Sequence, residues 1–338
     1  MRRVLVVLAV GLLGAFPVAM GGAVAWAAPG GVPGAPDKGS GGQPPSSDVV
    51  HVMQGNSAGK GGGSPFRTKN LSYHGGKVAT TPTVYLVLFG SQWGSDPSGE
   101  APRLVNFLGG LGGSETWSRS TTQYCQNVPT GTISCAGVSG AQFVTQPGAV
   151  YGGSWSDTSS AAPVQPSQTD LANEAKRAAT HFGVSGSNVQ FVIATAHGNN
   201  ASGFGTSYCA WHSSTSMTVN NVSVVVPYTN LPYITDAGAS CGMNFVNSGS
   251  TGTLDGVTIV EGHEYAETVT DPSPSNGWLD SGGAENGDKC AWLSSGQGAA
   301  TDISLSSGSF AVQSLWSNNF NSDAGGCVIS YTNAATQH

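Results

Sequence analysis

The sequence predicts an α/β (α+β) fold, in which a mixed sheet is packed against helices and stabilised by disulfide bonds. The first observation is a set of short β-branched and apolar runs, at residues 83–89, 188–195 and 222–228. The second is helical spacing of apolar residues beside these runs, at residues 98–111, 167–182 and 257–270. The third is an even number of cysteines, six, in a chain that begins with an export signal.

The N-terminus is predicted to be a signal peptide covering residues 1–27. Arg2 and Arg3 precede an apolar run at residues 4–13, and a small-x-small cleavage site ends at Ala27. The run is short for a membrane span and no second one follows, so we expect a secreted, extracellular protein without a membrane span. Without the two arginines the chain keeps 10 basic and 19 acidic residues, which disfavours nucleic acid and anionic membranes as partners.

Two further parts are expected after the signal. Residues 28–66 are dominated by Gly, Pro and Ser, and we predict a disordered linker or propeptide there because such a composition buries too little apolar surface to fold. Residues 67–338 are predicted to form a single secreted domain.

The elements of this domain follow in chain order. The run at 83–89 is a buried strand ended by Gly90, and residues 98–111 form a helix. Ser167 begins the next helix and Gly183 ends it. Two more core strands follow at 188–195 and 222–228. Asp255 is predicted to cap a helix whose interior runs from 257 to 270, and Pro272 ends it. After Cys290 the short Gly/Ser-rich segments indicate strands and loops.

The six cysteines predict disulfides, and without a Cys-x-x-Cys pair a cysteine zinc site is not expected. Fifteen pairings are possible. We predict that neighbours pair, because short loops are the simplest closures: Cys125–Cys135, Cys209–Cys241 and Cys290–Cys327.

Acidic residues are concentrated in one stretch of a chain with only 9% charged residues. Three of the seven glutamates, Glu261, Glu264 and Glu267, lie in one seven-residue window around His263. On a helix, His263 and Glu267 are four apart and share a face, which suits two ligands of one metal. Glu264 is one step round and is predicted to act as a catalytic general base. The arrangement is typical of the His-Glu-x-x-His helix of zinc peptidases, with Glu in place of the second His.

A third ligand must come from elsewhere in the chain. Our order of preference is Glu285, Asp271, His197 and then Asp288. The predicted metal ligands are therefore His263, Glu267 and Glu285, with Asp271 as a further candidate, and Zn²⁺ is the predicted cofactor. Two alternatives remain open at this point. The helix could be an exposed acidic helix without metal, and the loop at 280–288 could hold a structural calcium ion. His197, His74 and His212, each taken alone, are more typical of hydrogen-bonded structural histidines.

Several motifs together resemble the exordium-like, phosphate-induced protein family of extracellular proteins. They occur in order over roughly residues 70–330: Tyr73-His74-Gly75-Gly76, His263-Glu264-Tyr265-Ala266-Glu267, Thr270-Asp271-Pro272, and Glu285-Asn286-Gly287-Asp288-Lys289-Cys290. The resemblance implies an extracellular protein with a zincin-like metal-site helix. It favours Glu285 as the third site residue and places Cys290 beside it.

These observations predict a secreted metal-dependent hydrolase, similar to zinc metallopeptidases, that acts on extracellular protein or peptide. The alternative is a non-catalytic extracellular protein, associated with cell-wall or surface material, in which the metal is structural.

Overall fold

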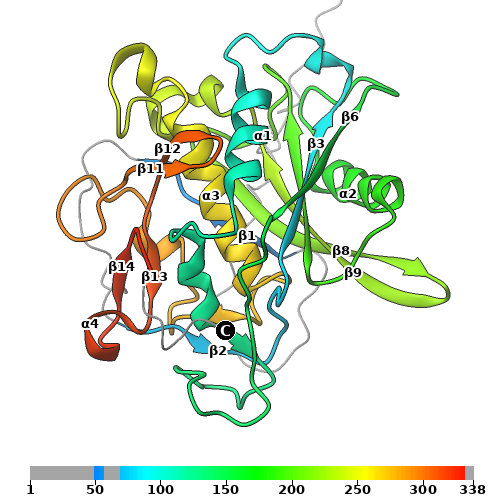
Figure 1. The fold of residues 1–338 in the computed structure, drawn as a ribbon. Coiled ribbons are helices and arrows are strands. Elements are labelled where there is room, and N and C mark those ends of the chain that lie inside the picture. The colour runs from blue at the N-terminus through cyan, green and yellow to red at the C-terminus, as the bar shows by residue number, and fades with distance from the viewer. Residues whose placement is uncertain (1–48, 57–68, 332–338) are drawn as a thin grey trace, which may run out of the picture. The chain divides into compact units, whose positions relative to one another are not determined.

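The structure, a computed structural model, describes residues 49–56 and 69–331. Its centre is a six-stranded mixed sheet with the strand order β1-β8-β9-β7-β3-β6 (Figure 1). Strands β6, β3, β7 and β9 are parallel, whereas β8 pairs antiparallel with β9, and β1 in turn pairs antiparallel with β8. The bounds of the six are β1 Val50–Met53, β3 Thr83–Phe89, β6 Tyr151–Asp157, β7 Val189–Thr195, β8 Ala210–Val219 and β9 Val222–Leu231. The predicted mixed α/β fold with disulfides is confirmed.

The alternation of side chains along the strands creates a core on each face of the sheet. In β3, Val84 and Leu86 belong to one buried cluster, while Val87 and Phe89 belong to the other. Helices α1 (Glu100–Gly110) and α3 (Asp255–Thr270) contribute to the first cluster. Helix α2 (Gln168–Phe182) contributes to the second. The sheet therefore separates α3 from α2.

The predicted helix signals hold for α2 and partly fail for α3. Ser167 and Asp170 form a reciprocal capping box at the start of α2, and Gly183 ends the helix in the left-handed conformation. The prediction that Asp255 caps α3 is wrong, because Leu254 precedes the helix and no side chain caps it. The Asp255 carboxylate instead accepts hydrogen bonds from the backbone N–H groups of Val246 and Asn247. It thus fixes the loop before the helix.

Smaller elements surround the sheet and helices. The remaining strands pair in twos: β2 (Ser72–Tyr73) with β10 (Trp278–Leu279), β4 (Cys125–Gln126) with β5 (Gln142–Phe143), β11 (Thr301–Leu305) with β12 (Gly308–Val312), and β13 (Leu315–Ser317) with β14 (Gly326–Val328). A short helix, α4 (Phe320–Asp323), precedes β14. The neighbour pairing of cysteines is confirmed at Cys125–Cys135, Cys209–Cys241 and Cys290–Cys327.

The prediction of disorder over residues 28–66 is wrong for residues 49–56. Val50–Met53 form β1, which pairs with β8 along its whole length, so that His51 stands opposite His212. The alternation of apolar residues in Val-His-Val-Met suits a half-buried strand, and the Gly/Pro-rich surroundings concealed it. The predicted signal peptide and the rest of the predicted linker lie outside the described residues. Within residues 49–56 and 69–331 no helix is long and apolar enough to cross a membrane.

Candidate metal centre

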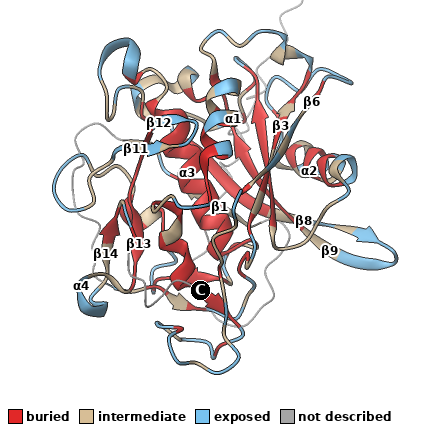
Figure 2. Ribbon diagram, in the orientation of Figure 1, coloured by how far each residue is buried: buried red, intermediate tan, exposed pale blue. Residues whose placement is uncertain are grey.

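Helix α3 is buried on all sides, and Figure 2 shows it as buried throughout. Two glycines permit this close packing. A Cβ at Gly256 would lie 1.9 Å from the carbonyl oxygen of Cys241, and one at Gly262 would lie 2.9 Å from the Trp117 ring. The carboxylates of Glu261, Glu264 and Glu267 are therefore all removed from water. An ionised carboxylate in such a place is strongly unfavourable unless a cation, a proton or hydrogen bonds compensate it.

Four side chains converge beside the C-terminal half of α3, and we call them the four-donor group. They are His51 from β1, His212 from β8, Glu267 from α3 and Glu285 from the following loop. One ligand atom of each lies within 4.8 Å of every other, and all four residues are buried. This set of imidazoles and carboxylates could hold a metal ion.

The distances in the four-donor group fit a tetrahedral site. His51 Nδ1 lies 3.4 Å from Glu267 Oε2 and 3.4 Å from Glu285 Oε2. His212 Nε2 lies 3.6 Å from Glu267 Oε2 and 2.8 Å from Glu285 Oε2. Ligands placed tetrahedrally at the usual zinc–ligand lengths are about 3.3 Å apart. Three of the four contacts are close to this spacing, and the fourth is a hydrogen bond between His212 Nε2 and Glu285 Oε2.

The His51 ring is oriented by a contact outside the four-donor group. Its Nε2 lies 3.0 Å from the carbonyl oxygen of Gly283. A carbonyl oxygen only accepts hydrogen bonds, so Nε2 carries a proton and Nδ1 is the nitrogen that faces the donor group. Burial opposes a charge on this ring, but Asp288 and Glu267 outweigh burial and raise the pKa of His51 to about 10. A metal ion would take the place of the proton on Nδ1. Nδ1 makes no hydrogen bond and faces two carboxylates. A backbone carbonyl that orients the ring through one nitrogen, with the other nitrogen directed at the site, is typical of metal-binding histidines.

A second cluster, the three-donor group, consists of His263, Glu267 and Asp288. His263 Nε2 lies 3.0 Å from Glu267 Oε1 and 3.7 Å from Asp288 Oδ1. Its Nδ1 lies 3.2 Å from Gln313 Oε1, and the Gln313 amide donates to the Gly287 carbonyl. Gln313 therefore fixes the His263 ring against Glu267.

The two groups share Glu267, but they use different oxygens of it. Oε1 accepts a hydrogen bond from the backbone N–H of Asp288 at 2.9 Å and also faces His263. Oε2 makes no hydrogen bond and faces His51 and His212. Of the two carboxylate oxygens of Glu267, Oε2 is the one that lacks a hydrogen bond, so the four-donor group is the better place for a metal ion. The three-donor group holds Glu267 in position.

Electrostatic effects distinguish Glu267 from the other acids. Burial opposes its ionisation, but His263 and His51 outweigh burial and bring the pKa of Glu267 well below its usual range. The pKa of Glu285 is raised well above its usual range, by burial first and then by Glu267 and the neighbouring aspartates. Burial lowers the pKa of His212 to about 3, with further contributions from His51 and His263. A neutral imidazole is the form that binds metals.

Glu264 is fully buried. Its pKa is raised well above the usual range, by burial first and then by the charges of Glu267, Glu261 and Asp288. The backbone amide of Met53 partly offsets this increase, because it lowers the pKa of Glu264. Glu264 is thus influenced by the acids of the donor groups and by the backbone of β1.

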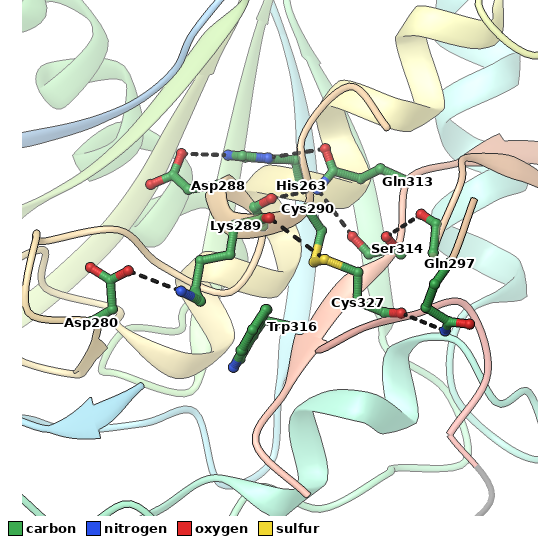
Figure 3. Close-up of a disulfide and its surroundings, with 12 residues drawn as sticks. His263, Asp280, Asp288, Lys289, Cys290, Gln297, Gln313, Ser314, Trp316 and Cys327 are labelled. Atoms are coloured by element: carbon green, nitrogen blue, oxygen red, sulfur yellow. Dashed lines mark hydrogen bonds and ion pairs between the residues drawn. A yellow bond between two sulfur atoms is a disulfide. The ribbon is translucent and has the colours of Figure 1, made fainter. Parts of the chain in front are cut away.

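The loop at residues 280–290 forms one wall of the centre. Figure 3 shows Asp288 and His263 close to the disulfide Cys290–Cys327. Asp280 pairs with Lys289 at 3.0 Å within this loop. A Cβ at Gly287 would lie 2.8 Å from His263 Nδ1, so the loop approaches the helix as closely as it does only because this residue is glycine. The disulfide and the ion pair hold Glu285 and Asp288 against α3.

The structure brings together most of the predicted site residues. Glu267 and Glu285 lie in the four-donor group, and His263, Glu267 and Asp288 form the three-donor group. Among the described residues, no single group therefore contains the predicted ligand set of His263, Glu267 and Glu285. Asp271 lies in neither group, although its carboxyl adjoins Glu285 and burial raises its pKa to about 6. His197 is well exposed on another part of the surface, where it is hydrogen-bonded to Asp236.

Sequence reasoning missed both histidines of the four-donor group. The composition of residues 28–66 places His51 in a predicted disordered linker, and His212 taken alone is typical of a structural histidine. Their link is the pairing of β1 with β8, which sets the two side by side. The signal available in the sequence was the apolar alternation around His51, since it indicates that this histidine belongs to a strand.

Comparisons with protein-family models, curated proteins and solved structures find no match to this chain. The resemblance to the exordium-like family therefore depends on the motifs alone.

Proposed function

We propose that the protein is a secreted metal-dependent hydrolase that binds zinc and acts on peptide bonds. The observation that carries the proposal is the convergence of two histidines and two carboxylates on one position, next to a further buried glutamate, Glu264. The three disulfides and the sequence-predicted signal peptide support an extracellular setting. Mixed imidazole and carboxylate donors suit zinc, whereas calcium prefers six or more oxygen ligands.

In this proposal, each residue has a distinct role. His212, Glu267 and Glu285 hold the zinc, and His51 completes the four-donor group in the structure described. His263 is a positioning residue, because it faces the other oxygen of Glu267. When bound, zinc would act as a Lewis acid towards a peptide carbonyl and make a water molecule more acidic. Glu264 would accept a proton from the attacking water as general base.

Zinc content and hydrolysis together test the proposal. Purified protein is expected to contain zinc and to cleave members of an unbiased peptide library. Glu264→Gln should lower the rate by about 100-fold or more at unchanged zinc content, because it removes only the base. Glu174→Gln, which alters a buried glutamate on the opposite side of the sheet, is the matched control. Equal cleavage rates in Glu264→Gln and Glu174→Gln, at equal zinc content, would overturn the proposed role of Glu264.

A second candidate is a non-catalytic extracellular protein with a structural zinc. It is favoured by one observation: all four donors of the four-donor group are protein side chains, and the side chains other than His51 are fully buried. Structural zinc sites are closed in this manner, whereas catalytic sites keep an open position. This candidate predicts that a chelator lowers the melting temperature while no peptide in the library is cleaved under any condition.

A further inference from the structure

Strand β1 differs from the other elements that carry the four-donor group. Among residues 49–56 and 69–331 it is the outermost strand on its side of the sheet and pairs with β8 alone. His212, Glu267 and Glu285 come from β8, α3 and the loop pinned by Cys290–Cys327, which are all embedded in the domain. His51 is thus the donor that belongs to a sheet-edge segment.

Residues 49–56 form several hydrogen bonds to the domain through their main chain. The carbonyl oxygen of Met53 accepts from the backbone N–H of Cys209 at 2.8 Å, and that of Gln54 accepts from Trp292 Nε1 at 2.7 Å. The N–H of Asn56 donates to the carbonyl oxygen of Ser240 at 2.7 Å. The Ser213 hydroxyl donates to the Val49 carbonyl. Such contacts do not depend on the side chains of the segment. They are how domains that bind peptides by strand addition hold an extended ligand.

The side chains of β1 alternate between two environments. His51 and Met53 are buried, His51 in the four-donor group and Met53 in the core cluster that contains α3. Val50 and Val52 are half-buried and pack against the cluster on the other face of the sheet. The edge of β8 therefore provides hydrogen-bond partners for the main chain of an extended segment. It also provides sites for the segment's side chains on alternating faces, and one of these sites adjoins the candidate metal position.

Strand β1 covers the two features that a hydrolase needs to expose. His51 Nδ1 fills the fourth corner of the four-donor group, and the Met53 backbone lies against Glu264. Without β1 the group would keep three protein ligands, His212, Glu267 and Glu285. Three protein ligands with an open fourth position are the arrangement of catalytic zinc sites.

We propose that the edge of β8 is a binding site for an extended peptide and that residues 49–56 are its occupant within the chain. A substrate would pair antiparallel to β8 in place of β1, with apolar side chains at alternate positions, and would displace His51 from the metal. The hydrolytic part of this inference rests on the proposed function, whereas the binding site itself does not.

A full-length variant with a broken strand, Val50→Pro/His51→Ala/Val52→Pro, tests the binding site directly. The probe is a fluorescent peptide with the sequence of residues 49–56, Val-Val-His-Val-Met-Gln-Gly-Asn. It should bind the zinc-loaded variant at least about tenfold more tightly than the wild type, whose site is already filled. A chelator, and replacement of the probe's histidine by alanine, should each weaken binding by about tenfold, because both remove the contact between histidine and metal. Equal binding to wild type and variant, or no binding to a folded, zinc-loaded variant, overturns the proposal.

The single substitution His51→Ala provides a second test if the broken-strand variant does not fold. With Co²⁺ in place of zinc, added azide should change the visible spectrum of His51→Ala but not that of the wild type, because only the variant has an open position. His74→Ala, which alters an exposed histidine outside the donor groups, should behave as the wild type. A wild-type spectrum that responds to azide as strongly as the His51→Ala spectrum overturns the proposal.

Hydrolysis separates this inference from the proposed function. If both hold, the broken-strand variant cleaves peptides at least about tenfold faster than the wild type. Metal-dependent binding of the probe without any cleavage would support the binding site and reject the hydrolase. Cleavage by the wild type at the full rate of the broken-strand variant would support the hydrolase and reject β1 as the occupant of its substrate site.

Discussion

Helices α2 and α3 are similar in length and lie on opposite faces of one sheet, but their charged side chains are in opposite environments. Helix α2 has a capping box, and its buried Glu174 is paired with Arg177, which is half-exposed. Helix α3 has no side-chain cap and is buried at every position, and both carboxylate oxygens of Glu261 and of Glu264 lack a hydrogen bond. Packing against the sheet and the surrounding loops holds α3 in place instead of a side-chain cap.

The difference distinguishes charged residues that stabilise the fold from charged residues that could bind a ligand. The charges of α2 satisfy one another locally, so they stabilise the helix that carries them. The acidic side chains of α3 are buried away from water, which disfavours their ionised form. Among the described residues, the donor groups around Glu267 provide possible partners for these charges. A cation in the four-donor group would compensate this buried charge. The predictions below test this contrast, from the largest expected effect to the smallest.

The largest effect is expected from Glu267→Gln compared with Glu174→Gln. The first should abolish metal binding and destabilise the fold by roughly 3–5 kcal/mol, because it removes the partner of buried histidines in both donor groups. Elemental analysis and urea unfolding measure the two effects. Glu174→Gln should lower stability but leave the metal content unchanged. Equal metal content in the two variants would contradict the contrast.

Metal removal is expected to have the next largest effect. A ligand present at 100 times its Kd stabilises the folded state by about 2.7 kcal/mol, so a chelator should lower the melting temperature of the wild type. Thermal unfolding with and without chelator measures the difference. Glu267→Gln should be insensitive to the chelator, and sensitivity equal to that of the wild type would place the metal elsewhere.

The third prediction concerns pH, for which the two helices should respond with opposite signs. Burial raises the pKa of Glu261 well above 4.5, so this residue destabilises the folded state increasingly as pH rises above that value. Glu261→Leu should therefore gain roughly 1–3 kcal/mol at neutral pH and almost nothing near pH 4. In α2, hydrogen bonds from Ser167 lower the pKa of Asp170 below 3.8, so its contribution is present above that value and is lost on acidification.

Unfolding curves across the pH range, with the metal concentration fixed, measure both responses. The difference between Glu261→Leu and wild type should grow with pH. The difference between Asp170→Asn and wild type should vanish in acid. A gain for Glu261→Leu that does not depend on pH would mean that Glu261 exerts its effect by packing and not by its charge.

The smallest effect is expected at the capping box of α2. Ser167→Ala should cost about 1 kcal/mol, because the backbone N–H of Asp170 loses its acceptor. Urea unfolding measures it, and metal content should stay at the wild-type level. A change in metal content would contradict the separation of the two helices by the sheet.

The same contrast explains what could be predicted from the sequence. Helix α2 and strand β3 carry their own signals, a capping box with a glycine stop and a continuous apolar run, so their limits were predicted closely. Helix α3 and the concentration of acids were also evident. The polar strand β8 was missed because its exposed half is rich in Ser and Thr and lacks an apolar run.

The donor groups were only half predictable. His263 and Glu267 are neighbours on one helix, so their spacing revealed them. His51 and His212 are 161 positions apart and meet only because β1 pairs with β8 in a particular register. No local pattern encodes such a pairing, since the strand edge that accepts β1 is formed by the folded sheet.

X-ray absorption at the zinc edge tests the central claim most directly. Zinc-loaded wild type should show a four-coordinate site of nitrogen and oxygen ligands with two imidazoles, those of His51 and His212. His51→Ala should retain zinc with one imidazole fewer, while His74→Ala should match the wild type. A spectrum without imidazole ligands, or one that His51→Ala leaves unchanged, would contradict a metal centre built on Glu267 and completed by β1.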